Sequence, residues 1–229
     1  MNETKKINVV LAGQGNTGKT SVFNYFTGSH QHTGNWAGKT IEKLEGTLYY
    51  KDYTIDVLDL PGIYSLTTLS VEELIAREYI IKHKPDVVIN IVDSTNLERN
   101  LIFTLQLLEL GCRVIVALNM IDIARKKGIT IDIPKLQNIL NTPVTGTVAS
   151  RGTGLTDLMD KVIELREVSN DRVSLNYGKE IEDCISQLTD ELKGVQVPYP
   201  ERWIAIKLLE KDNEIVKIIR QIKPEVLEK

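Results

Sequence analysis

Residues 7–20 read INVVLAGQGNTGKT, an apolar run that leads directly into a glycine-rich segment. The last eight letters fit the pattern GxxxxGK[ST], which binds nucleotide phosphates when a buried strand precedes it and a helix follows. Glycines let the backbone wrap closely around phosphates so that N–H groups point inward, and the helix N-terminus adds partial positive charge. This stretch therefore predicts an α/β fold with a phosphate-binding loop.

The side chains of this loop have separate expected roles. Lys19 is expected to reach the β- and γ-phosphates, and the Thr20 hydroxyl is expected to bind Mg2+. The alternative for this motif by itself is a glycine-rich turn that binds nothing, since short motifs occur by chance. The predicted nucleotide-binding residues here are Gly13, Gln14, Gly15, Asn16, Thr17, Gly18, Lys19, Thr20 and Ser21.

A second segment, Asp59-Leu60-Pro61-Gly62, ends a strand-like run at residues 53–58. A carboxylate at the end of such a strand can hold Mg2+ through water, and the Gly62 N–H can meet the γ-phosphate. Asp, Pro and Gly also form ordinary turns, which is the other interpretation. We expect Asp59 in the Mg2+ site and Gly62 among the catalytic groups.

Two later strand ends indicate guanine recognition. Residues 119–122 read NMID, and an aspartate at the fourth position can accept hydrogen bonds from N1–H and the exocyclic amine of guanine. Adenine lacks that donor pair, so Asp122 would be left partly unpaired against it. After the strand at 143–147, a backbone N–H can meet the guanine O6. The predicted base-binding residues are Asn119, Met120, Asp122, Val148, Ala149 and Ser150.

Composition is that of an ordinary globular protein. The chain has 229 residues, of which 42% are hydrophobic and 26% charged, enough for one α/β domain and a smaller second one. The net charge of −3 argues against nucleic acid as a partner, because no basic face is implied. Two cysteines are too few for a disulfide framework.

Strand-like and helix-like segments alternate along the first part of the chain. After about residue 167 the strand pattern stops, and residues 177–194, 200–210 and 212–222 predict short amphipathic helices. We therefore expect a six-stranded, mostly parallel sheet flanked by helices over residues 1–167, and a small helical domain over residues 168–229. The predicted strands are residues 6–12, 41–51, 54–59, 86–92, 113–118 and 143–147.

Several longer segments carry a resemblance to a known family. They are GQGNTGKTSVFNYFTG (13–28), TGNWAGKTIEKLEG (33–46), DLPGIYSL (59–66), DSTNLERNL (93–101), ALNMIDIA (117–124) and PERWIAIKLLE (200–210). With them the chain resembles the translation-factor-like P-loop GTPases, and among these the cytosolic N-terminal part of the FeoB ferrous-iron transporters. The resemblance covers nearly the whole chain. Gly15 departs from it, since proline is usual there, and so does Lys39, since a small apolar residue is usual.

The resemblance implies a function. It implies Mg2+-dependent, K+-stimulated binding and hydrolysis of GTP that regulates ferrous iron transport across the bacterial inner membrane. The chain would lie at the cytoplasmic face, with the transporter's membrane domain following residue 229. That membrane domain and small accessory Feo proteins would be its partners. The helical domain would modulate GDP affinity or relay the nucleotide state.

Two positions bear on the mechanism. In Ras-like GTPases a glutamine after the DxxG glycine orients the attacking water, whereas Ile63 stands there and cannot hydrogen-bond water. The resemblance implies that Asn16, with the carbonyls of Gly34 and Trp36, holds K+; an ordinary turn asparagine is the alternative. Thr40 is expected to join the Mg2+ shell with Thr20 and Asp59. The expected catalytic groups are thus Asn16, Lys19, Thr40 and Gly62.

Two other functions remain open at this stage. A free-standing regulatory GTPase of ribosome or tRNA maturation would share Asn16 and the missing glutamine, but would carry a basic RNA-binding appendage. A nucleotide sensor with negligible turnover is favoured by Ile63 alone. Phosphate release compared in KCl and NaCl distinguishes a K+-stimulated enzyme from such a sensor.

Overall fold

The computed structural model describes residues 5–67, 70–167 and 175–227. The chain divides into two compact units, one formed by residues 1–108 and 112–173 and the other by residues 109–111 and 174–229. The predicted boundary between residues 167 and 168 falls at the edge of the described part, so it stays a prediction.

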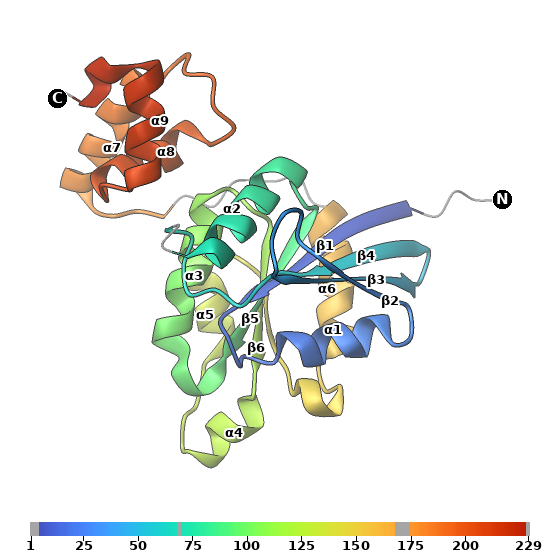
Figure 1. The fold of residues 1–229 in the computed structure, drawn as a ribbon. Helices are drawn as coiled ribbons and strands as arrows, with labels where there is room; N and C mark the ends of the chain where they lie inside the picture. The colour runs from blue at the N-terminus through green and yellow to red at the C-terminus, as the bar shows by residue number, and fades with distance from the viewer. Residues whose placement is uncertain (1–4, 68–69, 168–174, 228–229) are drawn as a thin grey trace. The chain divides into compact units, whose positions relative to one another are not determined.

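The first unit is built on a seven-stranded sheet with the order β2-β3-β4-β1-β5-β6-β7 (Figure 1). Strands β4, β1, β5, β6 and β7 run parallel, while β3 is antiparallel to β4 and β2 is antiparallel to β3. The mostly parallel α/β fold is thus confirmed. The strands are β1 (Lys5–Gly13), β2 (Gln31–Asn35), β3 (Glu42–Tyr50), β4 (Tyr53–Asp59), β5 (Val87–Asp93), β6 (Val114–Asn119) and β7 (Val144–Gly146).

The predicted strand number is wrong by one. Strand β2 was not expected, because its sequence QHTGN is polar and has no alternation of apolar residues. It forms through backbone pairing with β3, in a register that places Gln31 opposite Gly46 and Asn35 opposite Glu42. The result is a β-hairpin at one edge of the sheet, where a solvated strand needs no apolar face.

Helices cover both faces of the sheet, as parallel strands require. Helices α1 and α6 pack on one face, where Val22, Phe23, Leu158 and Val162 join Ile89 of β5 in the buried core. Figure 1 shows α2 and α3 on the other face. The helices of this unit are α1 (Lys19–Thr27), α2 (Val71–His83), α3 (Leu97–Glu109), α4 (Ile121–Lys126), α5 (Ile133–Leu140) and α6 (Leu155–Glu167), with the 3-10 turns η1 (Ser94–Asn96) and η2 (Ala149–Arg151).

The second unit contains the three predicted amphipathic helices. They are α7 (Lys179–Glu191), α8 (Glu201–Leu209) and α9 (Asn213–Ile222), followed by the 3-10 turn η3 (Pro224–Leu227). Trp203 is fully buried and stacks on Tyr199 with ring centroids 4.8 Å apart. Arg202 donates two hydrogen bonds of 2.7 and 2.8 Å to the Glu182 carboxylate, which ties α8 to α7.

Across the residues that the structure describes, none of the helices combines the length and the apolar character that crossing a membrane requires.

Parallel pairing brings the carboxyl ends of the central strands to one edge of the sheet. Gly13 ends β1, Asp59 ends β4, and Asn119 ends β6. Ligands of open α/β sheets bind at this edge, outside the ends of the strands. The predicted nucleotide residues of three separate segments therefore meet at one place.

Candidate functional site

The glycine-rich loop between β1 and α1 has the backbone conformations that its sequence predicts. Gly13 has φ +149°, and a Cβ built there would lie 2.4 Å from the Ile91 carbonyl oxygen. Gly18 has φ +93°, and a Cβ there would lie 2.3 Å from Nδ2 of Asn119. Between them Asn16 adopts a left-handed conformation with φ +64°, which asparagine tolerates better than most residues.

The loop presents a run of unused donors. Within the described residues, none of the backbone N–H groups from Gln14 to Ser21 donates a hydrogen bond to another part of the chain. The first N–H groups of a helix are ordinarily unpaired, and here they continue a run of unpaired N–H groups from the glycine-rich loop. A concave run of this kind binds anions. Helix α1 begins inside this run, at Lys19, and adds its dipole. The loop therefore offers donors and positive potential of the kind that phosphates need.

Lys19 and Asp59 face one another below the loop. The Lys19 ammonium lies 3.8 Å from Oδ1 of Asp59, and that oxygen has no hydrogen-bond partner among the described residues. Burial raises the pKa of the Asp59 carboxyl to about 6, and the nearby Lys19 charge opposes part of the rise. A buried carboxylate oxygen without a partner is suited to a Mg2+ ion and its waters, and the hydroxyl of Thr20, the exposed residue next to Lys19, is the second candidate ligand.

Residues 60–63 pack directly against the phosphate-binding loop. The Leu60 N–H donates to the Leu11 carbonyl at 3.0 Å, and the Ile63 N–H donates to the Gly13 carbonyl at 3.2 Å. A Cβ on Gly62 would lie 3.2 Å from both N and Cα of Gly15, so a larger residue would have to push the loop backbone away by a few tenths of an ångström. The structure thus brings Gly62 to the loop, where its N–H is expected.

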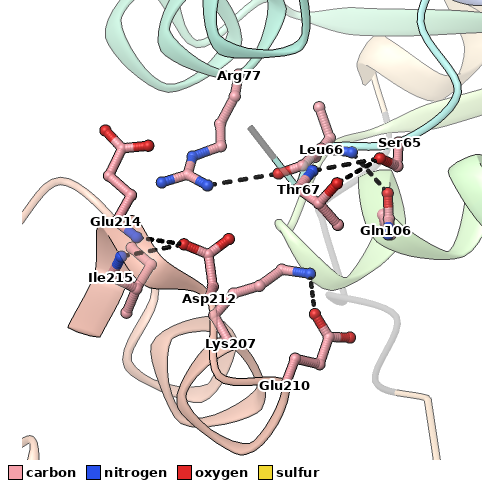
Figure 2. A network of polar contacts seen from close by, with 10 residues as sticks. All are labelled: Ser65, Leu66, Thr67, Arg77, Gln106, Lys207, Glu210, Asp212, Glu214 and Ile215. Carbon is pink, nitrogen blue, oxygen red and sulfur yellow. Dashed lines mark hydrogen bonds and ion pairs between the residues drawn. The ribbon is translucent and has the colours of Figure 1, made fainter. Parts of the chain in front are cut away.

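The segment after Ile63 is anchored to α2 and α3. The Leu66 N–H donates to Oε1 of Gln106 at 2.7 Å, and Arg77 donates to the Leu66 carbonyl at 3.4 Å (Figure 2). The Ser65 hydroxyl donates to the Glu73 carboxylate at 3.0 Å. These contacts fix the path of the chain past the loop.

Asn119 joins the phosphate side of the site to the base side. Its Nδ2 donates to the Thr17 carbonyl at 2.8 Å, while its Oδ1 accepts from the Ala149 N–H at 2.9 Å and from the Thr147 hydroxyl at 3.3 Å. Asn119 is buried, so each of these bonds satisfies a group away from water. Both polar atoms of the Asn119 side chain are thus used within the protein, where they hold the loop of the candidate residues 148–150.

The remaining base-binding candidates lie around Asn119. Met120 caps α4 in a left-handed conformation with φ +59°, and Asp122 lies in the first turn of α4, half-buried. Among residues 148–150, Val148 and Ala149 donate their N–H groups to Thr153 and Asn119, whereas Ser150 donates none to the described residues. The N–H available for a guanine O6 in this structure is thus that of Ser150.

Three candidate residues, Gly34, Trp36 and Thr40, lie in the hairpin of β2 and β3, and the structure does not bring them to the phosphate-binding loop. Gly34 lies in β2 opposite Lys43, and Thr40 is exposed in the turn between Trp36 and Ile41. Within the described residues, Gly34 and Trp36 contact β3, the turn that precedes it and α2, and not Asn16. The K+ site of Asn16, Gly34 and Trp36, and the place of Thr40 in the Mg2+ shell, therefore stay predictions.

Trp36, at the end of the β2–β3 hairpin, is half-buried. Its ring meets that of Tyr79 on α2 edge-on, with centroids 5.4 Å apart, and the Lys43 ammonium lies 5.4 Å from its ring. Tyr79 in turn stacks on His83 at 4.3 Å. The buried Nε1 of Trp36 has no hydrogen-bond partner among the described residues. The hairpin tip is thus fastened to α2 by aromatic contacts that the polar sequence around Trp36 did not predict.

Two side chains without an assigned role lie at the phosphate-binding loop. The Arg99 guanidinium lies 4.7 Å from the centre of the Tyr64 ring, and the Arg99 carbonyl accepts a 2.9 Å hydrogen bond from the Gln14 side chain. Both belong to segments that carried the family resemblance, 59–66 and 93–101, and which extend beyond the nucleotide motifs. The resemblance of these segments outside the nucleotide motifs could have pointed to Tyr64 and Arg99.

Among the described residues, no group of three or more histidine, cysteine or acidic side chains could hold a metal ion.

Comparison with known proteins gives a consistent result. The family model described as Ferrous iron transport protein B matches residues 7–162, and that of the FeoB cytosolic helical domain matches residues 177–229. The Fe(2+) transport protein A/Fe(2+) transporter FeoB fusion protein of Porphyromonas gingivalis is 45% identical over 220 residues, covering 93% of this chain and 26% of that protein. The Fe(2+) transporter FeoB of Escherichia coli is 42% identical over 219 residues, covering 91% and 27%. The chain therefore spans about a quarter of the length of these relatives.

Solved structures of similar chains include the cytosolic domain of T. maritima FeoB. Its apo form has a TM-score of 0.87 and 41% identity, covering 93% of this chain and 84% of that chain. Its GMPPNP form has a TM-score of 0.87 and 41% identity, covering 92% and 84%. The cytosolic domain of L. pneumophila FeoB has a TM-score of 0.81 and 32% identity, covering 94% and 98%.

Proposed function

Because the chain belongs to the family of ferrous iron transport protein B, we propose that it binds GTP with Mg2+ and hydrolyses it to GDP and phosphate. The observation that carries the proposal is the run of unused N–H groups from Gln14 to Ser21, within the described residues, beside Lys19 and Asp59. A triphosphate supplies the acceptors that this run lacks. The GMPPNP form of the T. maritima relative supports the same ligand class.

Each predicted residue has a place in this function. The loop N–H groups and Lys19 would bind the phosphates, while Thr20 and Asp59 would hold Mg2+, whose positive charge would offset that of the phosphates. Gly62 offers its N–H to the γ-phosphate. Asp122 and the Ser150 N–H read the guanine, in a loop held by Asn119. Catalysis then comes from positioning and charge neutralisation.

K+ stimulation belongs to the same proposal. Asn16 lies at the exposed turn of the loop, and its side chain makes no hydrogen bond to the described residues, so its oxygen is available to an ion. The carbonyls of Gly34 and Trp36 would be its further ligands if the hairpin lay closer to the loop than in this structure. Thr40 joins the Mg2+ shell in the same movement, because it lies in the same hairpin turn.

The larger role that we propose is control of ferrous iron transport at the cytoplasmic face of the bacterial inner membrane. Its support is the match of both units to family models of FeoB and the transporter names of the relatives. The fusion with Fe(2+) transport protein A in P. gingivalis supports small accessory Feo proteins as partners, beside the transporter's membrane domain. The helical unit would relay the nucleotide state or modulate GDP affinity.

Phosphate release from GTP tests the enzymatic proposal. We expect Mg2+-dependent turnover that is faster in KCl than in NaCl, loss of turnover in Lys19→Ala, and parent-like turnover in the matched control Lys126→Ala, an exposed lysine of α4. Calorimetric titration should show GTP binding and no comparable ATP binding. Equal binding of ATP would contradict the proposal.

One observation favours a sensor with negligible turnover as a second candidate. The Ile63 side chain is 1% exposed and leaves the glutamine position of Ras-like enzymes without a polar group. The same assay distinguishes the two, since a sensor binds GTP but releases no phosphate in either salt.

A further inference from the structure

A cavity of about 380 Å³ lies in the first unit, between helix α2 and the strands β1, β2, β3 and β4. Its volume lies in the range of pockets that bind small molecules. None of residues 13–21, which form the phosphate-binding loop and the start of α1, is among the described residues that line it. The cavity is therefore a space separate from the nucleotide site.

The floor of the cavity is polar, although a sheet face that a helix covers is ordinarily apolar. Val57 of β4 belongs to the buried core that α1 and α6 cover, so its neighbour Asp56 points to the opposite face, where Figure 1 shows α2. Thr47 lies opposite Asp56 in the register of β3 and β4, and Glu45 shares this face because it lies two residues earlier on β3. All three polar residues line the cavity. Packing of the fold gives no reason for two carboxylates at this place.

Helix α2 supplies an aromatic wall. Tyr79 and His83 line the cavity and stack on one another, and Trp36 meets the Tyr79 ring edge-on from the hairpin. The Tyr79 hydroxyl makes no hydrogen bond to the described residues. Burial raises the pKa of Tyr79, and the charges of Glu45 and Asp56 raise it further, so negative potential reaches across the cavity to the phenol.

Both carboxylates have capacity for another donor. Oε1 of Glu45 lies 2.6 Å from the Lys43 ammonium, and Oδ2 of Asp56 lies 2.7 Å from the Lys6 ammonium. The Thr47 hydroxyl donates to Oδ1 of Asp56 at 2.9 Å. Since the Glu45 and Lys6 side chains are 49% and 63% exposed, both ion pairs are open to solvent and weak, and a carboxylate accepts about four hydrogen bonds. A cation in the cavity can therefore share these oxygens with the lysines.

The lining favours a flat organic cation with a short apolar body. Val10 and Leu58 line the cavity, and Leu58 lies opposite Glu45 in the sheet. A guanidinium or amidinium group offers several N–H donors in one plane, which match carboxylate oxygens, and it can lie against an aromatic ring. Within the described residues, no three histidine or acidic side chains are grouped as a metal site requires, so a bare metal ion does not fit.

We propose that this cavity is a ligand site of its own, which binds a guanidinium or amidinium group through Glu45 and Asp56, with Tyr79 as its aromatic wall. The group comes from a free small molecule or from an arginine side chain of a partner protein, and the chemistry is the same for both. A ligand here touches α2 and the β2–β3 hairpin together, so it stabilises the contact of Tyr79 with Trp36. The inference does not depend on the proposed GTP hydrolysis.

Benzamidinium chloride tests the site, with benzamide as a neutral probe of nearly the same shape. We expect NMR shifts of backbone amides to change on β3, β4 and α2, and calorimetric titration to give about fivefold or more tighter binding for benzamidinium. Glu45→Gln and Asp56→Asn should each weaken benzamidinium binding about fivefold or more, because each keeps its shape and loses its charge. Glu42→Gln is the matched control, since Glu42 is exposed on the same strand and does not line the cavity.

Two peptides distinguish the sources of the group. A tripeptide with a central arginine, blocked at both ends, carries the guanidinium, and the same peptide with citrulline carries a neutral urea of similar shape. The citrulline peptide should bind about fivefold or more weakly than the arginine peptide. Tighter binding of the arginine peptide than of benzamidinium supports a partner protein, and the reverse order supports a free small molecule.

Equal binding of benzamidinium and benzamide, or amide shifts that lie away from β3, β4 and α2, overturns the proposal. The same holds if Glu45→Gln and Asp56→Asn keep the parent affinity while their circular dichroism spectra match the parent. If a variant does not fold, the two pairs of charged and neutral ligands on the parent chain decide. A chain that binds benzamidinium in the cavity but binds no GTP contradicts the proposed function alone.

Discussion

The Lys19 ammonium lies 3.8 Å from Oδ1 of Asp59, and the two side chains are only 10% and 7% exposed. This distance is too long for a hydrogen bond, so the pair is held together by charge alone. Each partner is left with unused capacity, Lys19 for a phosphate and Asp59 for a hydrated cation. Without ligands, burial of the ionised Asp59 carboxylate lowers the stability of the folded protein.

Stability should therefore depend on pH through Asp59. Its pKa is about 6 in the folded protein against an ordinary value of 3.8, so the folded state binds more protons between these values. The free energy of unfolding should then fall by about 2–3 kcal/mol from this group as pH rises through that window. Urea unfolding at pH 4 to 7 should show the fall in the parent and not in Asp59→Asn. Identical pH profiles for the two proteins would contradict it.

Removing Asn119 should weaken the fold as well as the site. Asn119→Ala deletes the bonds to Thr17 and Ala149 and leaves both buried groups unsatisfied. We expect the free energy of unfolding without nucleotide to drop by about 2–4 kcal/mol. The control is Asn138→Ala on the exposed side of α5, which should change it by less than about 0.5 kcal/mol. Chemical denaturation measures both.

Base selectivity should follow Asp122. An amide at this position offers a donor where guanine also has a donor, so Asp122→Asn should weaken GTP binding by about 100-fold or more. The same amide matches the 2-oxo group and N1–H of xanthine, so binding of xanthosine triphosphate should rise. Asp183→Asn, an exposed position of α7, serves as the control in the same calorimetric titrations. Unchanged preference for GTP in Asp122→Asn would refute the assignment.

Proline at position 15 should stabilise the protein. Gly15 precedes the left-handed Asn16 in a turn, and proline is favoured at the second position of such turns. A Cβ at Gly15 has open space, with the Tyr64 hydroxyl at 4.0 Å as its nearest contact. We expect Gly15→Pro to raise the free energy of unfolding by about 0.4–1 kcal/mol through the unfolded state. A decrease in urea denaturation would show that the turn does not accept the ring.

Trp36 should report the position of the hairpin. Its ring lies against Tyr79 in this structure, and Thr40 can join a Mg2+ shell only if the hairpin tip moves. GMPPNP with Mg2+ should therefore shift the tryptophan emission to longer wavelength, whereas GDP should not. Trp36→Phe removes this response and leaves the signal of Trp203, which is buried in the helical unit. A full response in Trp36→Phe would place its origin elsewhere.

Much of the site could be predicted because its chemistry lies in the backbone and in short motifs. The loop of Gly13 and Gly18, with Asp59 and Asn119, follows from strand ends that parallel pairing brings together. Strand β2 could not be predicted, since its polar residues are held by pairing with β3 and not by burial. The sequence also did not predict that the Ile63 side chain is buried while the Tyr64 side chain is exposed, because either neighbour could have packed into the core.

The contact of Gly18 with Asn119 has an evolutionary consequence. Any side chain at Gly18 would collide with the asparagine that supports the guanine loop, and loss of that asparagine would free the carbonyl of Thr17 in the loop itself. A substitution at Gly18 would thus displace Asn119, and a substitution at Asn119 would remove a hydrogen bond from the phosphate-binding loop. A substitution at Gly18 therefore requires a change at Asn119 as well, so the phosphate-binding loop and the loop after β7 are constrained together.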